Sequence, residues 1–234
     1  MRLRLREFRF RTGPHEHRVV QPRWPLRHTS LTAPDPIGML RGDHDGLNRL
    51  AGLFSFAAYS RHTIVHLPLR DGVPPDEGWG ERVDLVLAHH TLGLRPSQWP
   101  ELRRKLRNSS PLTVRTDEAR TARDAVSWRA RRERADVRDE LRHITHARTF
   151  FLFGNRDVFA ETATDFAHAA GWGPRQKGVV KGHSVLMAGL PLVQPPGGGH
   201  PVEVLICFKP YPPYAHFRRP GESATRPRRP AAAP

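Results

Sequence analysis

Histidine is the residue type whose number and spacing first suggest chemistry in this chain. The 234 residues include 14 histidines, and imidazole is both a general base near neutral pH and a common metal ligand. Three pairs have spacings that would bring two rings together: His62 with His66 on a strand, His143 with His146 on a helical turn, and the adjacent His89 and His90. No cysteine partner or His-Glu-x-x-His arrangement accompanies them. We therefore interpret them as exposed or hydrogen-bonded histidines and predict no metal site.

Three fragments combine acidic, amide and imidazole side chains: Gly42-Asp43-His44-Asp45, Gly154-Asn155-Arg156-Asp157 and Gly182-His183-Ser184. They resemble signatures of metallophosphoesterases, which hold two metal ions at strand ends to activate water. The chain departs from that pattern because Arg156 replaces a catalytic histidine and Ser184-Val185 replaces the second half of a Gly-His-x-His. A metal-dependent hydrolase is therefore a minor alternative, and Asn155 is predicted to cap a helix. We assign no catalytic residue and no cofactor.

Arginine gives the chain its charge. There are 38 basic and 23 acidic residues, with a formal net charge of +15, and only Lys105, Lys177, Lys181 and Lys209 among the basic residues are not arginine. Three segments carry most of the excess, since residues 1–11, 95–107 and 218–234 each have a net charge of +4. A genome rich in G and C would also favour arginine, so the position of the arginines in the chain is more informative than their number. These three segments are the predicted contacts with a polyanion.

The segment around residue 95 has the clearest binding pattern. Residues 92–106 resemble the turn and second helix of a helix-turn-helix, with Gly93 at the turn and Trp99 facing inward. The resemblance implies that this helix lies in the major groove, with polar side chains on bases and basic ones on phosphates. Pro100 early in the helix and a strand-like pattern over residues 83–87 depart from the motif. The alternative is a strand–helix unit with a basic face that contacts phosphates without sequence preference. The predicted nucleic-acid-binding residues here are Arg95, Ser97, Gln98, Arg103, Arg104, Lys105 and Arg107.

The C-terminal region supplies the rest of the predicted interface. Tyr211, Tyr214 and Phe217 precede Arg218 and Arg219, and such a mixture can stack on single-stranded bases. The alternative is that these aromatic rings pack back on the sheet. Residues 218–234 consist mainly of Arg, Pro and Ala, cannot bury a core, and are predicted to be disordered.

A long, charge-balanced helix is predicted over residues 117–142, where eight arginines face seven acids. We expect an exposed helix with intrahelical pairs such as Arg132–Asp136. An arginine ridge directed at phosphates is the alternative. Its predicted apolar stripe consists of Ala119, Ala122, Val126, Ala130, Val137, Leu141 and Ile144.

The other elements follow from periodicity and caps. Leu3 and Leu5 have opposite parity to Phe8 and Phe10, which predicts a strand over residues 3–11 with a bulge near Glu7. Residues 13–36 hold five prolines and are predicted to be an irregular connection. Further strands are expected at 62–69, 82–89, 112–115, 147–153, 184–193 and 202–208, and helices at 45–58, 97–107 and 155–170. Asp43 or Asp45 is predicted to cap the first of these helices.

These elements predict an α/β (or α+β) fold in one globular domain, residues 1–217. It would have one mixed β-sheet with packed helices, a C-terminal antiparallel hairpin and the disordered basic tail. The single cysteine, Cys207, excludes an internal disulfide and fits a reducing compartment. Residues 50–59 form the longest apolar run, well short of the roughly 20 residues of a bilayer span. The N-terminus lacks the apolar region of a secretory signal.

We therefore expect a cytoplasmic, non-enzymatic accessory protein that binds nucleic acid, DNA or RNA, through its arginine-rich segments. A protein–protein adaptor that binds an acidic partner is the alternative.

Overall fold

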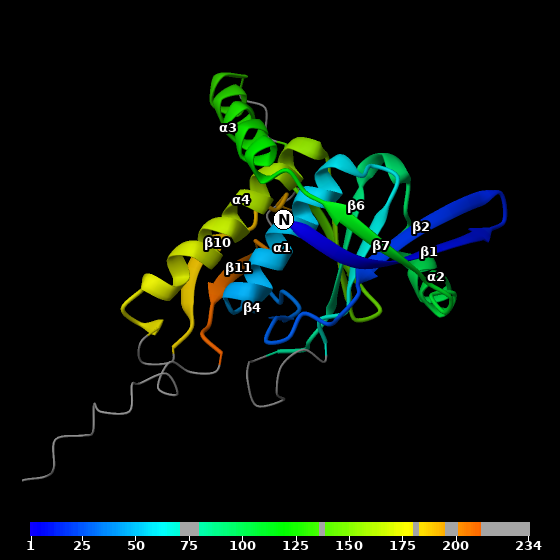
Figure 1. The fold of residues 1–234 in the computed structure, drawn as a ribbon, viewed down its shortest axis with the longest axis horizontal. Coiled ribbons are helices and arrows are strands. Elements are labelled where there is room, and N and C mark those ends of the chain that lie inside the picture. The colour runs from blue at the N-terminus through cyan, green and yellow to red at the C-terminus, as the bar shows by residue number, and fades with distance from the viewer. Residues whose placement is uncertain (71–79, 136–138, 180–182, 195–200, 212–234) are drawn as a thin grey trace, which may run out of the picture.

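The computed structural model describes residues 1–70, 80–135, 139–179, 183–194 and 201–211. It confirms a mixed α/β fold, but the strands form two sheets where the sequence predicted one (Figure 1). The seven-stranded sheet has the order β7-β1-β2-β5-β6-β9-β8, and the four-stranded sheet has the order β10-β11-β4-β3. The predicted disordered tail, residues 218–234, lies outside the described residues.

The seven-stranded sheet mixes parallel and antiparallel pairs. β2 pairs parallel with β5 and β6 pairs parallel with β9, while the other neighbours are antiparallel. Its strands are β1 (Arg2–Thr12), β2 (His15–Pro22), β5 (Ile64–Leu67), β6 (Asp84–His89), β7 (Ser110–Arg115), β8 (Arg142–His146) and β9 (Thr149–Gly154). The connection over residues 13–36 was predicted to be irregular, and this is wrong because it contains β2, which alternates too weakly to be recognised.

Both faces of this sheet are covered, and this explains the change of parity in β1. Leu3 and Leu5 belong to the large core on one face, whereas Phe8 belongs to a smaller cluster on the other. The β1–β2 register runs without interruption from Leu5 opposite Pro22 to Thr12 opposite His15. The predicted bulge near Glu7 is therefore wrong. A regular strand buries alternate residues on opposite faces, and both faces here have something to pack against.

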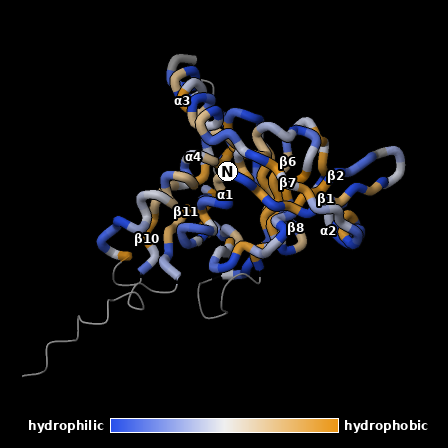
Figure 2. Tube along the Cα trace, viewed as in Figure 1, coloured by the Kyte–Doolittle hydropathy of each residue, from blue (hydrophilic) through white to orange (hydrophobic). Residues whose placement is uncertain are grey.

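Helices α1 (His44–Tyr59) and α4 (Arg156–Trp172) pack against each other and fill the large core. Each begins at a predicted cap: Asp43 Oδ1 accepts from the amide of Gly46 at 2.8 Å, and Asn155 Oδ1 accepts from the amides of Asp157 and Val158. The helices are antiparallel, because His44 Nδ1 lies 3.0 Å from the carbonyl oxygen of Ala170. Figure 2 shows the hydrophobic residues gathered in the sheets and along these helices.

The four-stranded sheet completes the large core. Its strands are β3 (Ser30–Leu31), β4 (Ile37–Gly42), β10 (Val185–Gly189) and β11 (Glu203–Phe208). The predicted antiparallel hairpin is confirmed as β10–β11, while β11 pairs parallel with β4 on its other side. Val204, Ile206 and Phe208 of β11 are buried in the same core as α4. β4 was not predicted, since its Gly, Met and Arg residues do not alternate clearly.

Helix α3 (Glu118–Ala135) is shorter than predicted, and residues 142–146 form the edge strand β8 instead. The predicted apolar stripe is also wrong: Val126 is 64% exposed, while Ala125 and Trp128 are buried. The contact is with α4, where Arg129 Nε lies 2.9 Å from Glu161 Oε1 and Arg131 Nη2 lies 3.2 Å from Asp157 Oδ2. These arginines therefore pair with α4. Asp136, the partner predicted for Arg132, lies outside the described residues, and an arginine ridge on this helix stays a prediction.

On the other face of the large sheet lies the basic segment, as a 3₁₀ turn at Pro96–Gln98 followed by the short helix α2 (Trp99–Arg104). Trp99 and Leu102 pack on Phe8, Val19, Ile64, Val86 and Phe151. Residues 84–89 form β6, so the first helix of a helix-turn-helix is absent from this part of the described chain. The alternative reading, a strand–helix unit with a basic face, is what the structure contains.

Among the described residues no helix has the length and apolar character needed to cross a bilayer.

Candidate nucleic-acid interface

Five exposed arginines lie together on the face of the large sheet that also carries α2. β1 places Arg2, Arg4 and Arg6 on this face, because residues two apart in a strand point the same way. Arg2 is directly opposite Arg115 of β7, and the amide of Arg23 donates to the carbonyl of Arg4 at 2.9 Å. We call Arg2, Arg4, Arg6, Arg23 and Arg115 the arginine face. Like charges directly opposite each other on neighbouring strands are destabilising, so this arrangement favours binding of an anion.

An exposed indole borders the arginine face. Trp24 follows β2 and is 49% exposed. The guanidinium carbons of Arg4 and Arg23 lie 5.5 Å and 5.2 Å from its ring centroid. Trp24, Arg2 and Arg4 also line an open pocket of about 390 Å³, which is completed by Leu5 and by Asp45 of α1, on the side of the sheet opposite to α2. An aromatic ring flanked by guanidinium groups is an arrangement on which unpaired bases stack.

A buried polar chain connects the arginine face with α2. Arg6 Nη2 donates to Gln21 Oε1 at 3.2 Å, and Gln21 Nε2 lies 2.6 Å from His66 Nδ1. Since the amide nitrogen is the donor, the ring proton of His66 is on Nε2, which lies 3.6 Å from Asp84 Oδ2. Burial lowers the pKa of His66, although Asp84 opposes this shift, so the ring is neutral.

Asp84 is the acceptor at the end of this chain. It is 1% exposed, and its Oδ2 lies 2.9 Å from Arg70 Nη2 and 3.7 Å from Arg103 Nη1. Burial raises its pKa, but contacts with His66 and Arg70 outweigh burial, so that the pKa of Asp84 is lowered overall. The carboxylate therefore stays charged, and Arg103 of α2 lies within ion-pair distance of it.

The predicted binding residues of α2 and its flanks fall into two groups. Arg103 contacts Asp84, and Lys105 Nζ lies 3.0 Å from Glu101 Oε1. Ser97, Gln98, Arg95, Arg104 and Arg107 are exposed, and the three arginines form no ion pair with another described residue. Thus Arg95, Arg104 and Arg107 remain available to an anion, while Arg103 has a structural partner. The predicted contacts Arg218 and Arg219 lie outside the described residues.

The structure places the hydrolase-like fragments far apart. Asp43 caps α1 beside the C-terminal end of α4, whereas Asn155 caps the beginning of α4. A helix of 17 residues separates its ends by about 25 Å. Across the described part of the chain, no three His, Cys, Asp or Glu side chains come close enough to hold a metal ion. The fragments do not form one site.

Sequence reasoning found part of this interface and missed the rest. The excess of arginine in residues 1–11 was recognised, but only Arg2, Arg4 and Arg6 share a face with α2; Arg9 and Arg11 have the opposite parity. Arg23, Trp24 and Arg115 were missed because only the strand register brings them beside β1. The alternation of arginine with leucine over residues 2–6 was the one signal that could have indicated an exposed basic face.

Comparison of the chain with family models, curated proteins and solved structures finds no match.

Proposed function

We propose that this protein binds single-stranded nucleic acid through the arginine face, Trp24 and the exposed basic residues around α2. The observation that carries the proposal is the direct juxtaposition of Arg2 with Arg115 and of Arg4 with Arg23, beside an exposed indole. Guanidinium groups contact phosphates in pairs of hydrogen bonds, and Trp24 supplies a stacking surface. A sheet face with an exposed ring suits splayed bases better than a duplex groove does.

Two of the three basic segments support the same surface. Residues 1–11 contribute three arginines to it, and residues 95–107 lie on the same side of the sheet, connected through Gln21, His66 and Asp84. A single nucleic-acid strand that crosses the arginine face would thus reach Arg104 and Arg107. We further propose that the protein acts in the cytoplasm as a non-enzymatic accessory protein.

The proposal is tested by titrating labelled DNA and RNA oligonucleotides with the protein at several salt concentrations. The triple variant R2Q/R4Q/R115Q keeps most of each side-chain stem and removes three charges. Each phosphate contact on a single strand contributes about 0.7 to the salt slope. We therefore expect the slope to fall by about 2 and the affinity to drop.

The matched control is R123Q/R142Q/K177Q, which removes three exposed charges elsewhere. If the two triple variants bind alike, the arginine face is not the site. A poly-glutamate peptide distinguishes the competing adaptor function: if it binds more tightly than either oligonucleotide, the partner is an acidic protein and the proposal is wrong.

A further inference from the structure

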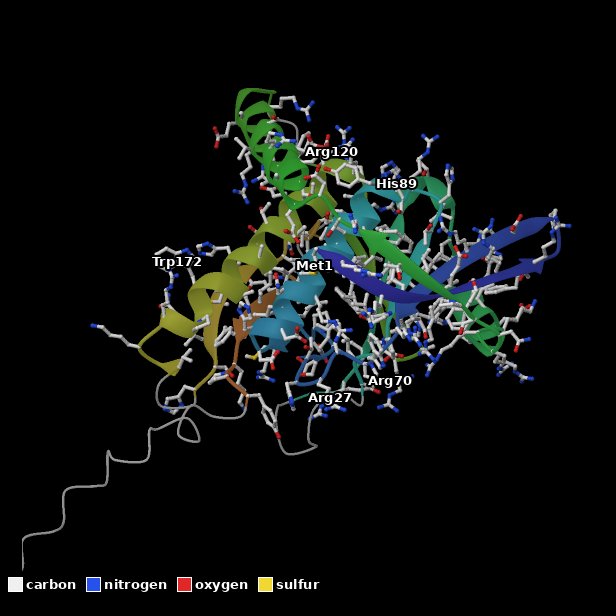
Figure 3. All side chains as sticks on the ribbon, in the orientation of Figure 1. Met1, Arg27, Arg70, His89, Arg120 and Trp172 are labelled. Atoms are coloured by element: carbon white, nitrogen blue, oxygen red, sulfur yellow. The ribbon has the colours of Figure 1, made fainter. Side chains whose placement is uncertain are left out.

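A second cationic site lies at the other end of β6, where an open pocket of about 790 Å³ forms next to the last residues of the strand. Arg70 contacts the first residue of β6 and His89 is its last, and Figure 3 shows these two side chains on opposite sides of the molecule. The pocket lies where the parallel strands β6 and β9 end, α1 ends and α4 begins. Its size is in the ordinary range for small-molecule sites.

The walls of this pocket are strongly basic. Six of its side chains are arginine or histidine: Arg18, Arg61, His62, His89, His90 and Arg156. The acidic side chain in the wall is Asp157, and it is already engaged, 2.9 Å from Arg156 and 3.2 Å from Arg131. Arg18 likewise contacts Glu7.

Arg61 lacks such a partner. Its Nε donates to His62 Nε2 at 3.0 Å, and its guanidinium forms no ion pair with a described carboxylate. The positive charge of Arg61 is therefore uncompensated at the pocket wall.

The adjacent histidines His89 and His90 also border the pocket, and a bound anion would change how many hydrogen bonds their rings can donate. The ring centroids of His89 and His90 are 4.7 Å apart, and His89 Nδ1 lies 2.9 Å from Thr91 Oγ1. Burial lowers the pKa of His89, and the neighbouring His90, Arg61 and His62 lower it further. A bound dianion would reverse these effects, because it stabilises the imidazolium.

Side chains rather than helix ends supply this positive charge. The beginning of α4 reaches the pocket, but Asn155 Oδ1 already accepts from the amides of Asp157 and Val158. Tyr59 and Ser60, at the end of α1, also line the pocket. The two antiparallel helix dipoles oppose each other there.

We propose that this pocket binds a phosphomonoester group. Such a group carries a charge of about −1.5 to −2 near pH 7 and has three acceptor oxygens, which suits a guanidinium beside two imidazole rings. The site is separate from the arginine face and does not depend on the function proposed for it. The phosphomonoester belongs either to a small molecule such as a mononucleotide or to the 5′ end of a polynucleotide.

The proposal is tested by calorimetric titration of the full chain with inorganic phosphate, AMP, and one oligonucleotide with either a 5′-phosphate or a 5′-hydroxyl end. The pocket variant is R61Q/H90Q, and the control is R123Q/H146Q, an exposed arginine and an exposed histidine elsewhere. We expect wild type and control to bind phosphate alike and the pocket variant to bind at least about tenfold more weakly, a difference of about 1.4 kcal/mol.

The ligands separate the two sources of the phosphomonoester. Pocket-dependent binding of AMP identifies a free small molecule, while pocket-dependent preference for the 5′-phosphorylated oligonucleotide over AMP identifies a chain end. The proposal is wrong if neither ligand nor phosphate binds at millimolar concentration, or if the pocket variant binds them as well as the control does. It is equally wrong if the pocket substitutions weaken the 5′-hydroxyl oligonucleotide as much as the phosphorylated one.

Discussion

The carboxylate of Asp84 lies 2.9 Å from the guanidinium of Arg70, and this contact completes a chain of polar side chains that runs across the large sheet from Arg6. Because Arg103 of α2 lies 3.7 Å from the same carboxylate, the arginine face and α2 are connected through one buried acid. Binding and stability should respond differently to substitutions at the two kinds of arginine, those that contact Asp84 and those that do not.

Asp84→Asn should lower the free energy of unfolding by about 3 kcal/mol, because it removes the charged acceptor of a buried ion pair. Chemical denaturation monitored by tryptophan fluorescence measures this. Glu101→Gln is the control, since it breaks an exposed pair with Lys105 and should cost less than about 1 kcal/mol. Equal losses in the two variants would show that Asp84 does not have this structural role.

Arg104→Gln with Arg107→Gln should weaken oligonucleotide binding without changing the melting temperature, since neither arginine has an ion-pair partner among the described residues. The salt slope should fall by about 1.4. Arg103→Gln, in contrast, should lower the melting temperature, because Arg103 contacts Asp84. Thermal melting and fluorescence anisotropy of the same samples measure stability and binding. A lower melting temperature in the Arg104/Arg107 variant would contradict the distinction between binding arginines and the arginine that contacts Asp84.

Trp24→Ala should reduce the affinity for a single-stranded oligonucleotide by about 1–3 kcal/mol, the contribution of one stacked base, and Trp24→Phe should restore part of it. The chain contains a closely matched control. Trp172 is also 49% exposed and has an arginine guanidinium, that of Arg175, 5.1 Å from its ring centroid, but it lies at the end of α4 (Figure 3). Trp172→Ala should leave the affinity unchanged, and an equal loss from both substitutions would argue against a stacking site at Trp24.

Asp165→Asn should flatten the pH dependence of stability between about pH 4 and pH 6. Burial raises the pKa of Asp165 from 3.8 to about 6, and Glu161 adds to the rise, although Arg129 opposes it. Because the folded state binds this proton more tightly, the stabilisation is complete below pH 3.8 and is lost as the pH rises through about 6.

Melting temperatures across this pH interval measure the effect. Asp45→Asn is the control, because Asp45 is 78% exposed and its substitution should keep the wild-type profile. A curve for Asp165→Asn that runs parallel to that of wild type would refute the assignment.

The sequence predicted those parts of the fold that depend on neighbouring residues. Asp43 and Asn155 mark the beginnings of α1 and α4 because a capping side chain acts within three residues. Strands β4 and β8 were among those not predicted from the sequence. β4 depends on a distant partner, since it is hydrogen-bonded to β11. β8 is an exposed edge strand whose residue pattern resembles that of a charged helix. The division into two sheets follows from those pairings and has no local signal.

The same distinction applies to the candidate site. Clustering of arginine in residues 1–11 and 95–107 was visible in the sequence, whereas the pairing of Arg2 with Arg115 requires contacts across more than a hundred residues. The composition of residues 95–107 cannot show that Arg103 forms an ion pair within the protein. The buried acid that contacts it, Asp84, lies in an apolar strand and gives no sign of its partner.

The parallel pairing of β4 with β11 has a consequence for synthesis on the ribosome. β4 emerges early, but its neighbour in the centre of the small sheet is made only when residues 203–208 have been translated. Until then the backbone of β4 has β3 alone to pair with, and the apolar side of α4 that β11 covers stays open to solvent. Every strand of the large sheet is thus synthesised before β11, the last described strand, which completes the small sheet.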